Sequence, residues 1–149
     1  YPPVFIDYAH TPEALGEALK TCSQNYPEKK IWLVFGCGGD RDPGKRPLMG
    51  EIADQKAHFI VLTDDNPRTE DSEQIFQDIL RGIDRKEKIM IEKNRKKAIL
   101  YAMASARLED IILIAGKGHE NYQIIGTTKT PFSDKKVVLD KLREKETAG

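Results

Sequence analysis

The sequence has no long hydrophobic run, no leader-like N-terminus and no excess of charge of either sign. Lys plus Arg and Asp plus Glu each number 24 in 149 residues, so the formal net charge is +0. This balance argues against nucleic acid or an anionic membrane as a main partner. No apolar run approaches the length of a membrane span, and no charged region followed by an apolar stretch opens the chain. We therefore expect a domain that binds neither nucleic acid nor membrane.

Cysteine is also scarce. Cys22 and Cys37 are the only two, which is too few for a disulfide framework, and they lack the spacing of a zinc site. We expect reduced thiols in a cytoplasmic protein, and no metal site. The chain opens with Tyr1-Pro2-Pro3 and lacks an initiator Met, as a fragment of a longer polypeptide would. Its length predicts a single domain with a real core.

Short apolar runs alternate with amphipathic segments along most of the chain. The runs predict strands at Val4–Asp7, Ile31–Phe35, Phe59–Leu62, Ile89–Ile91 and Ile111–Ala115. Helices are predicted to start after Thr11, Pro47, Ser72 and Asn94, with Thr11, Ser72 and Asn94 as N-caps. Leu48, Ile52 and Ala53 would form the apolar face of the second helix. Such alternation indicates a parallel sheet covered by helices on both faces.

The pattern changes after Gly118. Tyr122–Ile125 and Thr130–Phe132 flank a short polar segment and predict a hairpin, and Ser133 would cap a last helix. The expected fold is an α/β, Rossmann-like three-layer sandwich. Its mostly parallel sheet would have about six strands, one of them antiparallel.

Polar or glycine-rich segments follow the predicted strands. They span residues 7–12, 36–42, 63–68 and 116–120. In a doubly wound sheet, ligands bind outside the carboxyl ends of the strands. We therefore expect these segments to meet at one edge of the sheet and to form a binding site.

The glycine-rich segment is not a standard nucleotide loop. Arg41 stands where a dinucleotide fingerprint needs its third glycine. The spacing of residues 39–45 fits a Walker loop, but Arg46 replaces the Ser or Thr that would hold magnesium. Arg41, Lys45 and Arg46 suit an anionic ligand, and the alternative is a flexible turn.

The segment Asp65-Asn66-Pro67-Arg68 combines groups that a zwitterion requires. Arg68 offers a planar fork that matches a carboxylate, and Asp65 can accept from an ammonium group. Asn66 can serve either charge. The alternative is a capped turn whose charges are solvated.

Two further segments carry candidate ligands. Gly116 permits close approach of the backbone, and Glu120 supplies a second acceptor for an ammonium group. Lys117 suits a phosphate contact or is a surface charge. At the first strand end, Asp7 suits ribose hydroxyls, and its alternative role is capping near Thr11. We expect Tyr8 to be a packing residue.

Taken together, these segments resemble the Mur ligase family. The motifs are Asp7-Tyr8-Ala9-His10-Thr11-Pro12, Gly36-Cys37-Gly38-Gly39-Asp40-Arg41-Asp42 with Gly44-Lys45-Arg46-Pro47, Asp65-Asn66-Pro67-Arg68 and Gly116-Lys117-Gly118-His119-Glu120. They occur in the family's order over essentially the whole chain. The resemblance implies that residues 1–149 are the C-terminal domain of a three-domain, ATP-dependent amide-bond ligase. Its central domain would bind ATP and Mg²⁺, and its N-terminal domain would hold a uridine nucleotide.

The resemblance also implies a substrate and its contacts. In this branch of the family, meso-diaminopimelate is joined to UDP-MurNAc-L-Ala-D-Glu in peptidoglycan precursor synthesis. The positions that match the diaminopimelate contacts are Arg41, Asp65, Asn66, Pro67, Arg68, Gly116 and Glu120. Asp7, His10 and Lys45 would approach the nucleotide. No catalytic residue or metal ligand is expected in this chain, whose partner would be its own central domain, and the chain alone is expected to be inactive.

Other interpretations remain open. Lysine-adding relatives generally lack the arginine of the Asp65–Arg68 motif, so Arg68 favours diaminopimelate. A folylpolyglutamate ligase fits the combined motifs less well. From another class of protein, a module that binds a small ligand without chemistry is also compatible with the sequence. A dinucleotide-dependent oxidoreductase is disfavoured, because the glycine fingerprint is broken.

Overall fold

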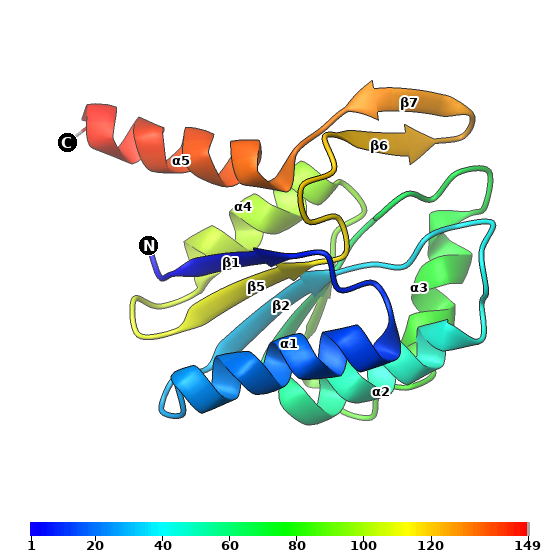
Figure 1. Ribbon diagram of the computed structural model, residues 1–149, viewed down its shortest axis with the longest axis horizontal. Coiled ribbons are helices and arrows are strands. Elements are labelled where there is room, and N and C mark those ends of the chain that lie inside the picture. Colours follow the sequence, from blue (N-terminus) through cyan, green and yellow to red (C-terminus); the bar gives the residue numbers. More distant parts are fainter. Residues whose placement is uncertain (149) are drawn as a thin grey trace.

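A computed structural model describes residues 1–148, with side chains described up to residue 144. Its main element is a five-stranded sheet in the order β1-β5-β2-β3-β4, in which every pair is parallel (Figure 1). The strands are β1 (Val4–Asp7), β2 (Ile31–Phe35), β3 (Phe59–Leu62), β4 (Ile89–Ile91) and β5 (Ile111–Ala115). The predicted strands are therefore confirmed at both ends.

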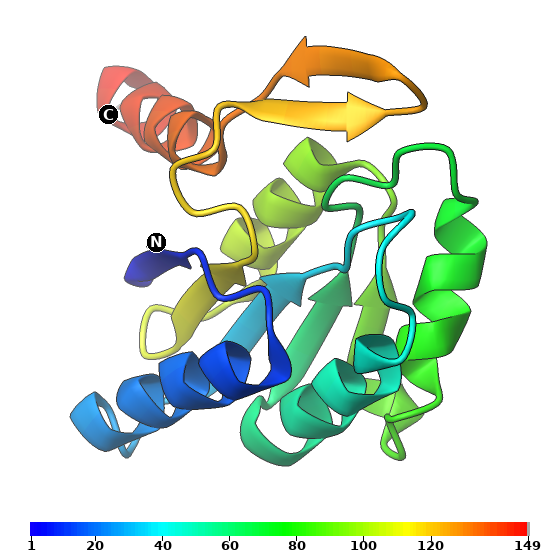
Figure 2. The ribbon, with the colours of Figure 1, turned by 45° about the vertical axis from the view of Figure 1, so that its right-hand side comes forward.

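Helices cover both faces of this sheet. They are α1 (Pro12–Asn25), α2 (Lys45–Lys56), α3 (Ser72–Leu80), α4 (Arg95–Ser105) and α5 (Asp134–Ala148), with a 3-10 turn η1 (Lys86–Lys88) before β4. In Figures 1 and 2, α1, α2 and α3 lie on one face, and α4 and α5 on the other. The chain thus has the three-layer, Rossmann-like α/β fold that the sequence predicts.

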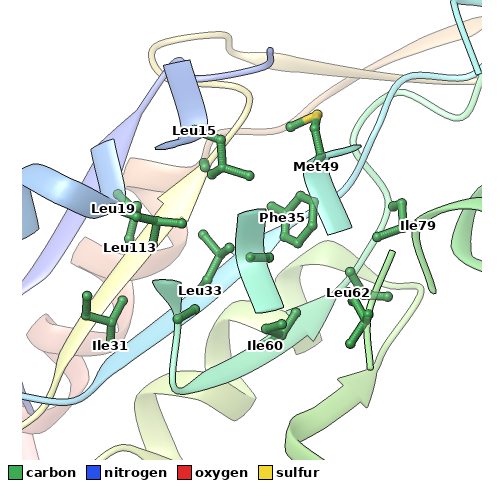
Figure 3. Packing of buried hydrophobic residues seen from close by; sticks show 14 of the residues in the cluster. Leu15, Leu19, Ile31, Leu33, Phe35, Met49, Ile60, Leu62, Ile79 and Leu113 are labelled. Atoms are coloured by element: carbon green, nitrogen blue, oxygen red, sulfur yellow. The ribbon is translucent and has the colours of Figure 1, made fainter. Parts of the chain in front are cut away.

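The two cores follow from the alternation of side chains along each strand. On β2, Leu33 and Phe35 pack against α1, α2 and α3, whereas Trp32 and Val34 pack against α4. Figure 3 shows the first core, where Met49 of α2 approaches Phe35. All five residues of β2 and of β5 are buried. Strands buried on both faces read as continuous apolar runs, which is why their bounds are evident from sequence.

Most predicted helix starts are confirmed by their caps. The side chain of Thr11 accepts a hydrogen bond from the N–H of Ala14, and that of Asn94 accepts from Lys97. Ser133 Oγ accepts from the N–H of Lys136 at 3.2 Å. The third helix differs from the prediction. Its N-cap is Asp71, which accepts from the N–H of Glu73, and Ser72 is the first helical residue.

The apolar face predicted for α2 is partly wrong. Leu48 is 52% exposed, whereas the adjacent Met49 is 1% exposed and lies in the core. One residue turns a helix by about 100°, so the two side chains cannot share a face. Ala53 is buried on the Met49 side, as predicted.

The predicted hairpin exists but forms its own sheet. Strands β6 (Tyr122–Ile125) and β7 (Thr128–Pro131) pair only with each other, apart from an isolated bridge between Arg68 and Ile125. Both edges of β5 are already paired, with β1 and with β2. The chain that leaves β5 therefore crosses the carboxyl ends of the strands before it pairs again, and Figure 2 shows the hairpin above them. Among the described residues, no helix is both long and apolar enough to cross a lipid bilayer.

Candidate functional site

A cavity of about 390 Å³ opens at the carboxyl ends of the parallel strands. Its walls come from the segments after β1, β2, β3 and β5. The lining residues are Tyr8, His10, Gly38, Arg41, Asp42, Lys45, Asp65, Asn66, Arg68, Gly116 and Glu120. All the predicted site residues except Asp7 and Pro67 are in this set. Arg68 and Glu120, from different loops, therefore share one cavity.

The two predicted residues outside the lining, Asp7 and Pro67, stabilise the loops around the cavity. Asp7 Oδ1 accepts a hydrogen bond from the N–H of Ala9 at 2.8 Å, which closes a tight turn after β1. Asp7 lines a separate cavity beside α1. Pro67 is buried, and a Cβ on Gly39 would lie 1.8 Å from its carbonyl oxygen. Close packing of Gly39 on Pro67 thus holds the second and third loops together.

Lys117 lies beneath the site and contacts three of its lining residues. Its side chain is 0% exposed, and Nζ donates to Asn66 Oδ1 at 2.8 Å and to Glu120 Oε1 at 3.3 Å. Nζ also forms an ion pair with Asp65 Oδ1 at 3.4 Å. The suggestion from sequence that Lys117 is a surface charge is therefore wrong, and its three protein partners leave no donor for the other suggested role, a phosphate contact. A buried lysine requires such partners, because an unpaired buried charge is costly.

Asn66 joins the site to the hairpin. Its side-chain oxygen accepts from Lys117 Nζ at 2.8 Å and from the N–H of Ile124 at 3.0 Å. Both acceptor positions of this oxygen are therefore occupied, and only the amide NH₂ can serve a ligand, as a donor. Asn66 is thus suited to a ligand carboxylate.

Arg68 is held in an unusual backbone conformation, with φ of 53°. Its N–H donates to the oxygen of Ile124 at 3.0 Å, and its carbonyl accepts from Gly126 at 2.7 Å. Nη1 donates to the oxygen of Gly39 at 2.9 Å. Positive φ in a residue other than glycine is strained and persists where surrounding bonds enforce it. Within the described part of the chain, Nε and Nη2 of Arg68 have no protein acceptor and remain for a ligand.

The glycine-rich loop carries Arg41 at its tip. Arg41 Nη1 donates to the oxygen of Asp40 at 2.9 Å. Asp40 Oδ2 accepts from Thr69 Oγ1 at 2.7 Å and from the N–H of Thr69 at 3.1 Å, and these bonds lower the pKa of the Asp40 carboxyl. The loop is therefore tied to the segment that contains Arg68.

Arg46 does not face the cavity, contrary to the interpretation that it suits an anionic ligand. It is fully buried and donates to Glu70 Oε2 at 2.6 Å, Asp78 Oδ2 at 2.9 Å and the oxygen of Gly38 at 3.0 Å. The bond from Arg46 lowers the pKa of the Glu70 carboxyl. Arg46 thus stabilises the glycine-rich loop from below, a role that its position beside Lys45 did not reveal.

Residues from the β1 loop close the opposite wall. Lys45 Nζ donates to the oxygen of His10 at 3.1 Å, and the Tyr8 and His10 rings meet edge to face with centroids 4.7 Å apart. Tyr8 Oη donates to Glu120 Oε2 at 3.4 Å, and the charge of Glu120 raises the pKa of Tyr8. The prediction that Tyr8 is a packing residue is wrong, because Tyr8 is 53% exposed and lines the cavity.

Gly116 allows Asp65 to approach the backbone. Its φ is 117°, and a Cβ there would lie 2.6 Å from Asp65 Oδ2. Both the conformation and the contact exclude a side chain. Gln123 Nε2 donates to the oxygen of Asp65 at 2.8 Å, so the hairpin also holds this residue.

The cavity therefore presents guanidinium groups and carboxylates to one volume. Arg41 and Arg68 can pair with carboxylates, and Asp65 and Glu120 can accept from an ammonium group. No cluster of His, Cys, Asp and Glu suited to a metal ion occurs among the described residues. Fold and cavity define a Rossmann-like α/β domain with a small-molecule cavity of mixed charge at the carboxyl edge of its sheet.

Comparison with known proteins identifies the family. Residues 2–118 match the family model described as Mur ligase, glutamate ligase domain. The chain belongs to the Mur ligase family. It is 52% identical to the UDP-N-acetylmuramoyl-L-alanyl-D-glutamate–2,6-diaminopimelate ligase of Haemophilus influenzae, over 95% of this chain and 29% of that protein. The corresponding ligase of Chromobacterium violaceum is 53% identical, with the same coverage.

A solved structure of a ligase with this name superposes with a TM-score of 0.90 at 46% identity. The superposition covers 96% of this chain and 29% of that one. The chain thus spans less than a third of the length of the relatives that it matches.

Proposed function

We propose that this chain is the C-terminal, amino-acid-binding domain of an ATP-dependent ligase that joins meso-diaminopimelate to UDP-MurNAc-L-Ala-D-Glu. The observation that carries the proposal is the shared cavity of Arg68 and Glu120. The relatives named as diaminopimelate ligases match over 95% of the chain, which supports the same assignment.

The charges of the cavity suit the far end of diaminopimelate. This amino acid differs from lysine by a carboxylate beside its distal amine. In the proposed complex, Arg68 and the amide NH₂ of Asn66 bind that carboxylate, and Asp65 with Glu120 accepts from the ammonium group. Gly116 lets Asp65 lie against the backbone, Pro67 shapes the loop, and Arg41 pairs with another carboxylate of the ligand. The residues of this chain thus bind and orient the amino acid.

The remainder of the enzyme would supply the nucleotide chemistry. In the family's reaction, ATP with Mg²⁺ in the central domain converts the D-glutamate carboxylate to an acyl phosphate. The amine of the amino acid displaces phosphate to form the amide. We place His10 and Lys45 near the nucleotide, since both line the cavity on the side of the β1 loop. Asp7 is a weaker candidate for this role, because its carboxylate closes its own turn. We also propose that the protein is cytoplasmic, where its nucleotide substrates are made.

The test is the substrate preference of the full-length enzyme after Arg68→Ala. Without Arg68, the bound carboxylate of diaminopimelate loses its partner charge. We therefore expect kcat/KM for diaminopimelate to fall by the factor that corresponds to about 3 kcal/mol. A site built for a charged group rejects an analogue that lacks it by a factor on the order of 10⁴, so the preference over lysine should collapse. Arg107→Ala is the matched control, since Arg107 is exposed, precedes β5 at the end of the strand opposite the cavity, and does not line the cavity. An unchanged preference for diaminopimelate over lysine in Arg68→Ala would refute the assignment.

A further inference from the structure

Lys117 lies under the cavity without lining it. We propose that Lys117 is a positioning residue that orients Asp65 and Glu120 and sets the charge of the site so that it accepts one ammonium group. This inference rests on the proposed function, to which it adds a residue that does not touch the substrate.

The contacts of Lys117 leave none of its N–H donors for a ligand. A lysine ammonium has three donors. Its acceptors are Asn66 Oδ1 at 2.8 Å, Glu120 Oε1 at 3.3 Å and Asp65 Oδ1 at 3.4 Å. With a side chain that is 0% exposed, Lys117 cannot reach the cavity. It acts through the groups that it holds.

Each carboxylate is oriented by this arrangement. Glu120 has Oε1 on Lys117 and Oε2 within 3.4 Å of Tyr8 Oη. Asp65 has Oδ1 on Lys117, and its Oδ2 lies over the backbone of Gly116. Because Lys117 binds one oxygen of each acid, the second oxygen of each is turned away from it. The two acids come from loops that follow β3 and β5, and Lys117 is the cation that both contact.

The charges of these groups give the site its selectivity. Two carboxylates and one lysine leave a net charge of minus one, which one ligand ammonium group neutralises. Without Lys117 the two like charges would repel each other, and neither carboxylate would keep the orientation that its contact with the ammonium group gives it.

Other titratable groups near the two acids lie in the cavity wall and beneath it. Those that line the same cavity are Tyr8, His10, Arg41, Asp42, Lys45 and Arg68. Beneath it, Cys37, Asp64 and Arg95 interact electrostatically with Asp65, and Arg95 also interacts with Glu120. Arg95 is fully buried and paired with Asp134. Lys117 is therefore the cation in direct contact with both carboxylates.

The test uses Lys117→Met in the full-length enzyme. We expect KM for diaminopimelate to rise on the order of 30-fold, with kcat and KM for ATP little changed. Lys129→Met is the matched control. Lys129 lies 4.0 Å from the centroid of the same Tyr122 ring that Lys117 approaches at 5.6 Å, but it does not line the cavity.

A second variant keeps the inference testable if Lys117→Met does not fold. Lys117→Arg retains a positive charge and N–H donors beneath the two acids, but the guanidinium group is larger and planar, so the acids shift. We expect KM for diaminopimelate to rise on the order of 5-fold in Lys117→Arg, with kcat and KM for ATP little changed. A purely structural role for Lys117 would change all three quantities together.

The outcomes also separate this inference from the proposed function. If the wild-type enzyme shows no turnover that depends on diaminopimelate, both the proposed function and the positioning role are refuted. If the wild type uses diaminopimelate, a KM for Lys117→Met within about twofold of wild type, or an equal rise in KM for ATP, overturns the positioning role alone. The same holds if Lys117→Arg changes kcat or KM for ATP as much as KM for diaminopimelate.

Discussion

Arg95 and Asp134 form a fully buried ion pair with two parallel hydrogen bonds, Nε to Oδ1 at 2.8 Å and Nη2 to Oδ2 at 2.9 Å. They are the first residues of α4 and α5. The same guanidinium donates to the oxygens of Asp64 at 3.1 Å, two residues after β3, and of Ala115 at 3.2 Å, the last residue of β5. This pair thus fixes two helices to the strand ends that carry Asp65 and Gly116.

Asp134→Ala should therefore destabilise the domain strongly. It leaves the Arg95 charge buried without its carboxylate, a loss of about 3–5 kcal/mol in the free energy of unfolding. Urea denaturation of this chain measures the loss. Asp140→Ala is the control, because the Asp140–Lys136 pair is exposed and should contribute little to stability. Equal losses in the two variants would contradict the structural role of the Arg95–Asp134 pair.

Gly116→Ala should damage both stability and the site. The alanine would have φ near 117° and a Cβ 2.6 Å from Asp65 Oδ2, so we expect a loss of about 2–3 kcal/mol. Gly126→Ala isolates the cost of the backbone conformation. Its φ is 64°, and nothing lies within 4 Å of an added Cβ. In thermal or urea unfolding, Gly116→Ala should be clearly less stable than Gly126→Ala. The reverse order of stability would show that the Asp65 contact is unimportant.

His58 should make stability depend on pH. Burial, helped by Lys30 and Lys88, lowers its pKa in the folded chain, and Nδ1 accepts from the N–H of Ile31 at 2.9 Å. The folded state therefore binds fewer protons than the unfolded state. The contribution is present above the unfolded pKa of about 6.5 and is lost as pH falls toward the folded pKa.

Urea unfolding between pH 5 and 7.5 measures this dependence. His58→Asn keeps a side-chain acceptor but cannot titrate, so its free energy of unfolding should fall less with decreasing pH than that of the wild type. Gln24→Asn, at an exposed residue that does not titrate, is the control and should retain the wild-type slope. Identical slopes for wild type and His58→Asn would rule out His58 as the source.

The chain by itself should catalyse no ligation. It lacks the Ser or Thr of a Walker loop after Lys45, and no metal-binding cluster occurs in the part that the structure describes. A coupled assay for ADP release, with diaminopimelate and UDP-MurNAc-L-Ala-D-Glu, should remain at background. The full-length enzyme serves as the positive control. ATP-dependent amide formation by these 149 residues would contradict the proposed division of labour.

The architecture was largely predictable from local patterns. Strands such as β2 and β5 are buried on both faces and read as uninterrupted apolar runs, so their bounds were clear from sequence. The parallel topology then placed the segments after β2, β3 and β5 at one edge, which brought Arg41, Arg68 and Glu120 into one cavity. The N-cap of α3 was less certain from sequence, because Asp71 and Ser72 are adjacent and both have side chains that can cap a helix.

The sequence by itself determined the order of the elements, the sheet edge and most of the cavity lining. Only the tertiary structure decided which cations are buried, that Lys117 and Arg46 face inward, and that the hairpin pairs with itself and holds Asn66 and Arg68. The physical reason is the separation along the chain of the residues that decide each feature. Strand and helix patterns reflect neighbours along the chain, whereas the burial of a charge depends on partners such as Asp65 and Glu70, which folding brings from other elements.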